Sequence, residues 1–274
     1  NTIDPKAFLN TKLNNIKLSK DLTIFNSSSE NKYYEPFAEG TGTIYYYGSN
    51  SVIVDYIENT TDTLVWKAIA TVTLDANGGS VSKDSIEAVY EETYGSHDTL
   101  PIPTKTGYTF DGWYTEVSGG TKVTDETNTI KSTDHTLYAR WQKDAKDLTI
   151  TLDTTNYTYD GNEKKPSVTV KDGSVTLTSG TDYTVSYTNN INAGTATVTI
   201  TGNGVYNSTT NSTYIGTGST TFTIDKKSVE VNWGETTTFT YDGGEHAPTA
   251  SVTSGVTGET INVTRTTEIN AGGY

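Results

Sequence analysis

The side chains that most often carry chemistry are few in this chain. The three histidines are His97, His135 and His246, and none has a second histidine or a carboxylate at the spacing of metal ligands. We therefore expect surface or loop histidines. A Ser-His-Asp triad assembles in space rather than in sequence, so that alternative stays open, but no nucleophile-elbow motif supports it.

Acidic residues are numerous enough to hide a catalytic pair or a cation site. The 33 acidic residues could include a glycosidase pair, but nothing in the sequence singles out two of them. The densest pair is Glu91 and Glu92, but neighbours on a strand point to opposite faces, so we prefer solvated charge. Residues 75–78 and 160–163 suggest calcium loops without EF-hand spacing. The same residue types form tight turns, so we expect turns, no metal and no cofactor.

Aromatic side chains are the best candidates for ligand contact. The chain has four tryptophans and 19 tyrosines, which could stack on sugars. We expect Trp113 and Trp141 in a core. Tyr45, Tyr46 and Tyr47 are consecutive, so a strand there turns at least one of them outward. These three tyrosines are the predicted ligand contact.

Two adjacent lysines allow a covalent alternative. Lys164 and Lys165 lie near a predicted strand start, with acidic residues close by. A Lys–Asn isopeptide cross-link is one interpretation, and ordinary surface lysines are the preferred one. A mass lower by one ammonia would reveal such a bond.

Composition narrows the class of protein. The 274 residues carry a formal net charge of −14, which argues against nucleic-acid or anionic-membrane binding. There is no cysteine, so disulfides and cysteine-ligated zinc are absent. Apolar residues make up 32%, and Tyr, Val, Ile and Thr alternate with polar residues. We expect a mainly β, multi-domain chain of thin sheets.

The ends suggest a piece of a longer protein. Methionine is absent and the chain begins with Asn1. No apolar run approaches the ~18–20 residues that span a bilayer. We therefore expect any signal peptide or wall anchor to lie outside the chain.

Residues 1–70 differ from the rest in their spacing of apolar residues. Thr-Ile occurs at residues 2–3 and again at 23–24, a period in the range of leucine-rich repeats. The segments 4–8, 13–18 and 22–24 resemble a BspA-type leucine-rich repeat. Residues 43–48, with Tyr56 and Trp66, resemble the closing segment of such arrays. The resemblance implies a last coil and cap. Residues 51–58 could form a short helix behind an Asn50 or Ser51 cap, although Val and Ile there favour a strand.

Residues 71–142 form the clearest module. Strands are predicted at 71–75 and 86–94, a turn at 76–79, and a strand that places Tyr108, Phe110 and Tyr114 on one face. Leu137, Ala139 and Trp141 share a face of the last strand. The motifs resemble the internalin B or Listeria–Bacteroides repeat, which implies a small β-grasp-like fold without catalytic residues. They are DANGG (75–79), LP (100–101), GYTFDGWY (107–114) and TLYARW (136–141).

Residues 143–225 and 226–274 repeat one another. Tyr-Asp-Gly begins at Tyr159 and again at Tyr241, 82 residues later, and Ile-Asn-Ala-Gly recurs at 191–194 and 269–272. Alternating runs such as 183–187 and 195–200 predict a β-sandwich. The pair resembles bacterial immunoglobulin-like surface repeats of the MBG type. The second copy stops early, so we expect an incomplete sheet, and we expect a short loop at 142–146 between modules.

The leading interpretation is a non-catalytic, secreted or wall-attached region of a modular bacterial surface protein, with adhesion and spacer roles. Its expected partner is a protein or glycan of a host or neighbouring cell, and the chain is expected to be a monomer. An alternative is a set of accessory modules of a larger secreted polysaccharide-acting enzyme. In a third, the chain is itself a hydrolase, which would need two carboxylates facing each other in a cleft.

Overall fold

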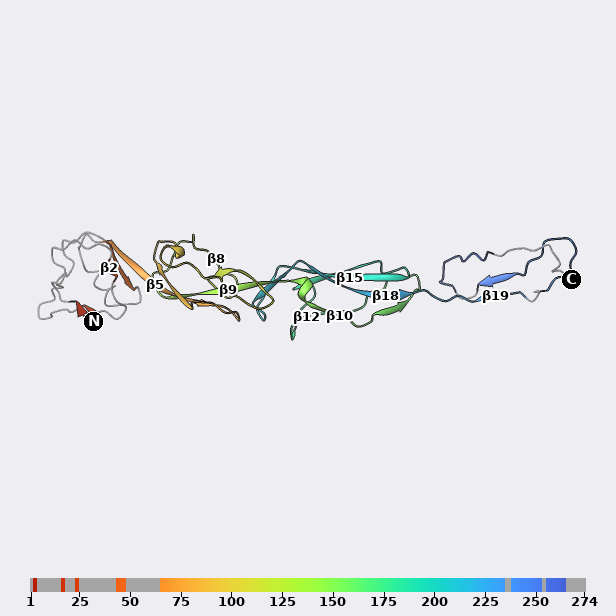
Figure 1. Ribbon diagram of the computed structural model, residues 1–274, viewed down its shortest axis with the longest axis horizontal. Helices are drawn as coiled ribbons and strands as arrows, with labels where there is room; N and C mark the ends of the chain where they lie inside the picture. Colours follow the sequence, from red (N-terminus) through yellow and green to blue (C-terminus); the bar gives the residue numbers. More distant parts are fainter. Residues whose placement is uncertain are drawn as a thin grey trace. The chain divides into compact units, whose positions relative to one another are not determined.

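The chain is mainly β in the computed structural model (Figure 1). The structure describes residues 2–3, 16–17, 23–24, 43–47, 65–234, 238–252 and 255–264. Two compact units are present: residues 1–144 with 204–215, and residues 145–203 with 216–274. No helix in the described part is long and apolar enough to cross a membrane. The leucine-rich motif at 4–8, most of the one at 13–18, the helix over 51–58 and Tyr56 lie outside the described residues.

Short parallel strands open the first unit. β1 (Thr2–Ile3) pairs with β3 (Thr23–Ile24) in register, so the two Thr-Ile copies lie side by side. β2 (Ile16–Lys17) pairs with β4 (Thr43–Tyr47), and β4 pairs with β5 (Val65–Asp75), also in parallel. Successive coils of a solenoid return the chain to a neighbouring parallel strand in this way.

β5 also pairs with strands of residues 71–142, in the same sheet as β2 and β4. Beyond its pairing with β4, it pairs antiparallel with β6 (Ser85–Val89) and parallel with β9 (His135–Asp144). β7 (Thr109–Tyr114) pairs with β8 (Lys122–Val123) and with β9. β5 therefore joins the parallel strands β2 and β4 to the strands of residues 71–142.

The core of this sheet confirms the predicted alternation on β9. Leu137, Ala139 and Trp141 are at most 1% exposed, and Trp113 is 2% exposed. Both tryptophans are therefore core residues, as predicted. The buried cluster is completed by residues from β5, β6, β8 and the short 3-10 helix η1 (Tyr94–Ser96): Val72, Leu74, Ile86, Ala88, Tyr94 and Val123.

Two predictions for residues 86–114 were wrong. The strand that was predicted to reach Tyr94 ends at Val89, because the chain turns at Glu91, whose φ is +63°. Tyr114 does not share the face of Tyr108 and Phe110. The pairing of β7 with β9 shifts between Phe110 and Gly112, and this bulge moves Trp113 onto the core face in place of Tyr114.

A hairpin from later in the chain completes the first unit. β16 (Tyr206–Asn207) pairs antiparallel with β17 (Ser212–Ile215), and β17 pairs parallel with residues 141–144 of β9. The prediction of a loop over residues 142–146 was therefore wrong. β9 runs to Asp144 because β17 pairs with its last four residues. The 3-10 helix η2 (Ala145–Asp147) follows directly.

Up to Asp225, the second unit contains two sheets over one core. One sheet has the order β11 (Asn156–Thr158), β18 (Thr217–Asp225), β15 (Gly194–Gly202), β14 (Tyr183–Thr188). The other has the order β10 (Thr149–Leu152), β12 (Val168–Asp172), β13 (Val175–Thr176). The alternating runs at 183–187 and 195–200 are strands, as predicted. The core joins Ala196, Val198, Phe222 and Ile224 to Leu152 and Val168. Further along, β19 (Val231–Trp233) pairs with β20 (Ala250–Val252).

The two Tyr-Asp-Gly copies form the same turn. Asp160 accepts a hydrogen bond from the Asn162 amide at 2.9 Å, and Asp242 accepts one from the Gly244 amide at 2.9 Å. The glycine between them has a positive φ in both copies, +82° and +84°. Each aspartate also contacts a basic side chain four residues later, Lys164 or His246.

Candidate interaction surface

The tyrosine strand lies against the start of β5. Tyr45 is opposite Lys67 and Tyr46 is opposite Ala68 in the parallel ladder. Both tyrosine side chains are half-buried, so neither is fully turned outward. Burial raises the pKa of the Tyr46 hydroxyl. The side chain of Tyr47 lies outside the described residues.

Tyr45 belongs to a small group of ring and charged side chains. Its ring meets the exposed His97 edge to face, with ring centroids 5.5 Å apart. Lys67, the strand partner of Tyr45, forms an ion pair with Glu92. The Lys67 ammonium also donates a hydrogen bond to Glu92, and this bond is the main cause of the raised pKa of Lys67. Such a surface offers a ring face, a ring nitrogen and a paired charge for contact with a polar ligand.

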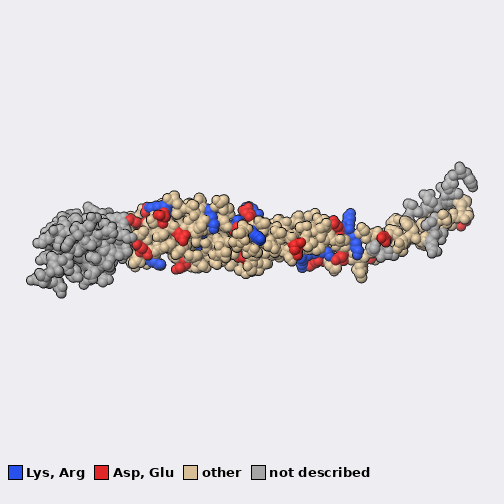
Figure 2. Space-filling view, turned by 90° about the horizontal axis from the view of Figure 1, so that it is seen from below, with Lys and Arg blue, Asp and Glu red and all other residues tan. Residues whose placement is uncertain are grey.

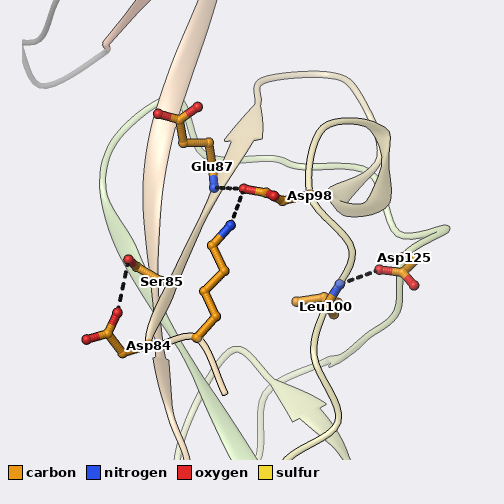
Figure 3. A network of polar contacts seen from close by, with 7 residues as sticks. Asp84, Ser85, Glu87, Asp98, Leu100 and Asp125 are labelled. Carbon is orange, nitrogen blue, oxygen red and sulfur yellow. Dashed lines mark hydrogen bonds and ion pairs between the residues drawn. The ribbon is translucent and has the colours of Figure 1, made fainter. Parts of the chain in front are cut away.

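A network of polar contacts holds the segment that carries His97 (Figure 3). The Asp98 carboxylate accepts hydrogen bonds from Lys83 Nζ at 2.8 Å and from the Glu87 amide at 3.3 Å. Both lower the pKa of Asp98, the Lys83 bond most. The Asp125 carboxylate accepts a bond from the Leu100 amide at 2.8 Å. Asp98 therefore ties this segment to β6, and Asp125 ties Leu100 to the residues that follow β8.

A second surface feature is a groove of about 710 Å³ beside the first residues of β7, here called the Tyr108 groove. Ser80 and Thr104 join its two walls by paired backbone hydrogen bonds of 2.7 and 2.8 Å. Ile102 is 78% exposed at its rim. The groove is lined by residues 78–80, 102–106 and 108–110 and by Trp141.

Cations and rings meet in the Tyr108 groove. Lys105 Nζ lies 4.2 Å from the centre of the Tyr108 ring, and Lys143 Nζ lies 4.7 Å from it. Lys105 Nζ also donates to the Thr210 carbonyl oxygen at 3.0 Å. Phe110 packs edge to face on Trp141 at 5.7 Å. We did not predict this groove from the sequence. The feature that could have indicated it is the segment Pro101-Ile102-Pro103, of which Ile102 and Pro103 line the groove.

The outer face of β7 and β9 carries a polar cluster. Asp111 accepts hydrogen bonds from the Tyr114 hydroxyl at 2.8 Å and from Gln142 Nε2 at 3.2 Å, and it pairs with Lys122. Burial, with the Asp111 hydrogen bond second, raises the pKa of Tyr114 to about 12. Positive and negative side chains are interspersed over the described residues of the face in Figure 2.

The three histidines lie at separate places. His97 contacts Tyr45, and His135 Nε2 is 2.8 Å from the Tyr94 hydroxyl. His246 Nε2 lies 2.7 Å from the carboxylate of Asp242, four residues earlier in the chain. No cluster of metal-ligating side chains occurs among the described residues.

The segments that suggested calcium or a cross-link have local partners. The Asp75 carboxylate accepts the Asn77 amide at 2.8 Å, and Asn77 Nδ2 donates to the Ala139 carbonyl at 3.0 Å, so residues 75–78 form a turn, as predicted. Lys164 and Lys165 each contact a carboxylate, Asp160 and Glu163 respectively, at 2.5 Å.

Parts of the chain are similar to known proteins. Residues 71–140 match the family model of the Listeria-Bacteroides repeat domain. A stretch of 104 residues is 34% identical to Internalin H of Listeria monocytogenes serovar 1/2a (strain ATCC BAA-679 / EGD-e). The match covers 36% of this chain and 18% of Internalin H, so the chain spans less than a fifth of that relative. The predicted resemblance of residues 71–142 to this repeat is confirmed by the match of residues 71–140 to its family model.

Proposed function

We propose that this chain is a non-catalytic, extracellular region of a modular bacterial surface protein that presents a contact surface and acts as a spacer. In this proposal residues 1–70 are the closing part of a leucine-rich solenoid, and residues 143–225 and 226–274 are immunoglobulin-like modules. The protein is secreted or attached to the cell wall, and the chain is a monomer.

Strand continuity is the observation that carries the proposal. Ile69 of β5 pairs with Tyr47 on one side and with Val89 on the other. The closing parallel strands and the Listeria-Bacteroides repeat therefore share a hydrogen-bonded strand where a flexible linker would otherwise lie. A shared strand resists bending far better than a linker, which suits a module that holds a binding surface away from a cell.

The partner that fits best is a protein or glycan on a host or neighbouring cell. Tyr45 and Tyr46 lie at the joint between the parallel strands and the repeat, and half-buried tyrosines present a rigid ring with a polar end. The net charge of −14 disfavours nucleic acid and anionic membranes as partners.

Binding of the purified chain to arrays of glycans and of extracellular-matrix proteins tests this proposal. We expect binding that Tyr45→Ala weakens at least about ten-fold, while Tyr241→Ala, at a 62% exposed tyrosine of the second unit, leaves it unchanged. A thermal melt of each variant separates loss of contact from loss of fold.

Two results would overturn parts of the proposal. No binding on either array would remove the contact role and leave the spacer role. Release of sugars from a polysaccharide by the chain alone would overturn the non-catalytic assignment.

A further inference from the structure

Strand β9 has an edge that β5 covers only in part. Tyr138 pairs with Asp75 of β5 and with Tyr114 of β7, so these two strands lie on opposite edges of β9. β5 ends at Asp75, but β9 continues to Asp144. Past the end of β5, residues 141–144 would present a row of unpaired backbone groups, which is a surface for strand addition.

Strand β17 occupies this open edge. Trp141 pairs with Phe110 of β7 on one side and with Ser212 of β17 on the other. β17 therefore continues the line of β5 along the same edge of β9. Ser212 and Tyr214 are fully buried there, and the Tyr214 hydroxyl donates to Thr210 Oγ1 at 2.9 Å. These side chains are part of a packed interior.

Side chains lock the same hairpin in place. The guanidinium carbon of Arg140 lies 3.9 Å from the centre of the Tyr114 ring and 4.9 Å from that of Tyr206. A planar guanidinium stacks well on aromatic rings. Lys105, from the rim of the Tyr108 groove, donates to the Thr210 carbonyl. The hairpin is thus held by backbone pairing, a stacked cation and a lysine contact.

The second unit does not need the hairpin to close its own ladder. Thr201 pairs with Thr217 at the end of the β15–β18 ladder, and the Gly202 amide donates to the Gly216 carbonyl at 3.0 Å. The two ends of the hairpin therefore meet at one point. A three-residue turn would join β15 to β18 as well as the present insertion does.

We propose that residues 204–215 are a clasp: a β-hairpin, inserted in the module that follows, that docks by strand addition on the open edge of β9 and completes the fold of the Listeria-Bacteroides repeat. This edge fits a short hairpin whose small serine (Ser212) and tyrosine (Tyr214) are buried. A second tyrosine of the hairpin, Tyr206, places its ring next to the Arg140 guanidinium. This inference does not depend on the proposed adhesion role.

Removal of the clasp is the first test. Joining Asn203 directly to Gly216 leaves Gly-Asn-Gly as a three-residue turn, with Gly216 already in the left-handed region at φ +70°. We expect the melting temperature of the repeat, followed by tryptophan fluorescence, to fall by on the order of 10 °C. Amide exchange should accelerate at least about ten-fold at residues 141–144, and less at residues 135–138, which β5 covers.

Point variants keep the proposal testable if the deletion disturbs the whole chain. Tyr206→Ala should lower the melting temperature of the repeat, whereas Val205→Ala, at a neighbouring side chain that is 48% exposed, should not. Unchanged exchange at residues 141–144 in the deletion variant would overturn the clasp. So would equal effects of Tyr206→Ala and Val205→Ala where the deletion variant does not fold.

Discussion

The indole of Trp141 lies so close to Gly79 that a Cβ atom on the glycine would stand 2.4 Å from its Cζ2 atom. Neither side of this contact can move easily. Trp141 is 1% exposed, and its Nε1 donates to the Ala76 carbonyl at 3.2 Å. The Thr104 carbonyl oxygen would lie 2.6 Å from the same Cβ atom. Gly79, the second glycine of the DANGG motif, is therefore required because the turn packs directly on Trp141 of β9.

Gly79→Ala should destabilise the repeat by about 1–3 kcal/mol, because a methyl group would force Trp141 or the backbone at Thr104 to shift. Chemical denaturation followed by tryptophan fluorescence measures the change. Gly255→Ala is the matched control, since its nearest neighbour would be an Ile261 carbon at 3.5 Å. A stability equal to that of the native chain would show that the repeat absorbs the methyl group without strain.

His135 should make the repeat less stable in mild acid. Burial, the largest cause, lowers the pKa of His135 below its ordinary value of about 6.5. The folded state therefore disfavours the charged form. The free energy of unfolding is therefore highest, as far as His135 is concerned, above the unfolded-state pKa. It declines as the pH falls below about 6.5 towards the folded-state pKa.

Thermal unfolding of the native chain and of His135→Asn at about pH 7.5 and about pH 5 measures this effect. We expect the native chain to lose more stability between the two pH values than the variant does. The carboxylates common to both proteins cancel in the difference. An identical loss in both proteins would contradict the prediction.

The sequence predicted the parts of the fold that depend on local alternation. Residues 137, 139 and 141 obey period two because β9 has a core on one face only, and the tryptophans follow the same rule. The bulge at Asp111 and Gly112 was missed because it inserts a residue into the pattern without an apolar signal of its own.

Features that depend on distant pairing could not be read from the sequence. The hairpin at 204–215 has the composition of a surface loop, and only its pairing with β9 explains the burial of Ser212 and Tyr214. The Tyr108 groove likewise depends on Ser80 and Thr104, which meet through backbone bonds that any residue type could make. For the predicted tyrosine contact, the strand was foreseen, but the approach of His97 to Tyr45 was not.

Asp98→Ala should loosen the segment that places His97 beside Tyr45. The variant removes the acceptor for Lys83 and for the Glu87 amide, which together tie residues 94–100 to β6 (Figure 3). We expect faster amide exchange at Glu87 and loss of the ring contact between Tyr45 and His97 in NMR spectra. Asp84→Ala is the control, because Asp84 contacts only the neighbouring Ser85 hydroxyl in this network. Equal effects of both variants would argue against Asp98 as the anchor.

Tyr114 should ionise well above the ordinary pKa of a phenol, and Asp111 should be one reason. The pKa of Tyr114 is raised to about 12, first by burial and then by its hydrogen bond to Asp111. Because the folded-state pKa exceeds the unfolded value of about 10, the stabilisation is present below pH 10 and is lost as the pH rises through 12.

Asp111→Asn removes the negative charge that disfavours the phenolate, so it should lower the pKa of Tyr114. The difference in phenolate absorbance between each protein and its Tyr114→Phe counterpart isolates this one titration. Asp125→Asn changes the same charge on a carboxylate that bonds the Leu100 amide, and it should leave the Tyr114 curve in place. A curve that stays at about 12 in Asp111→Asn would mean that burial alone sets the ionisation of Tyr114.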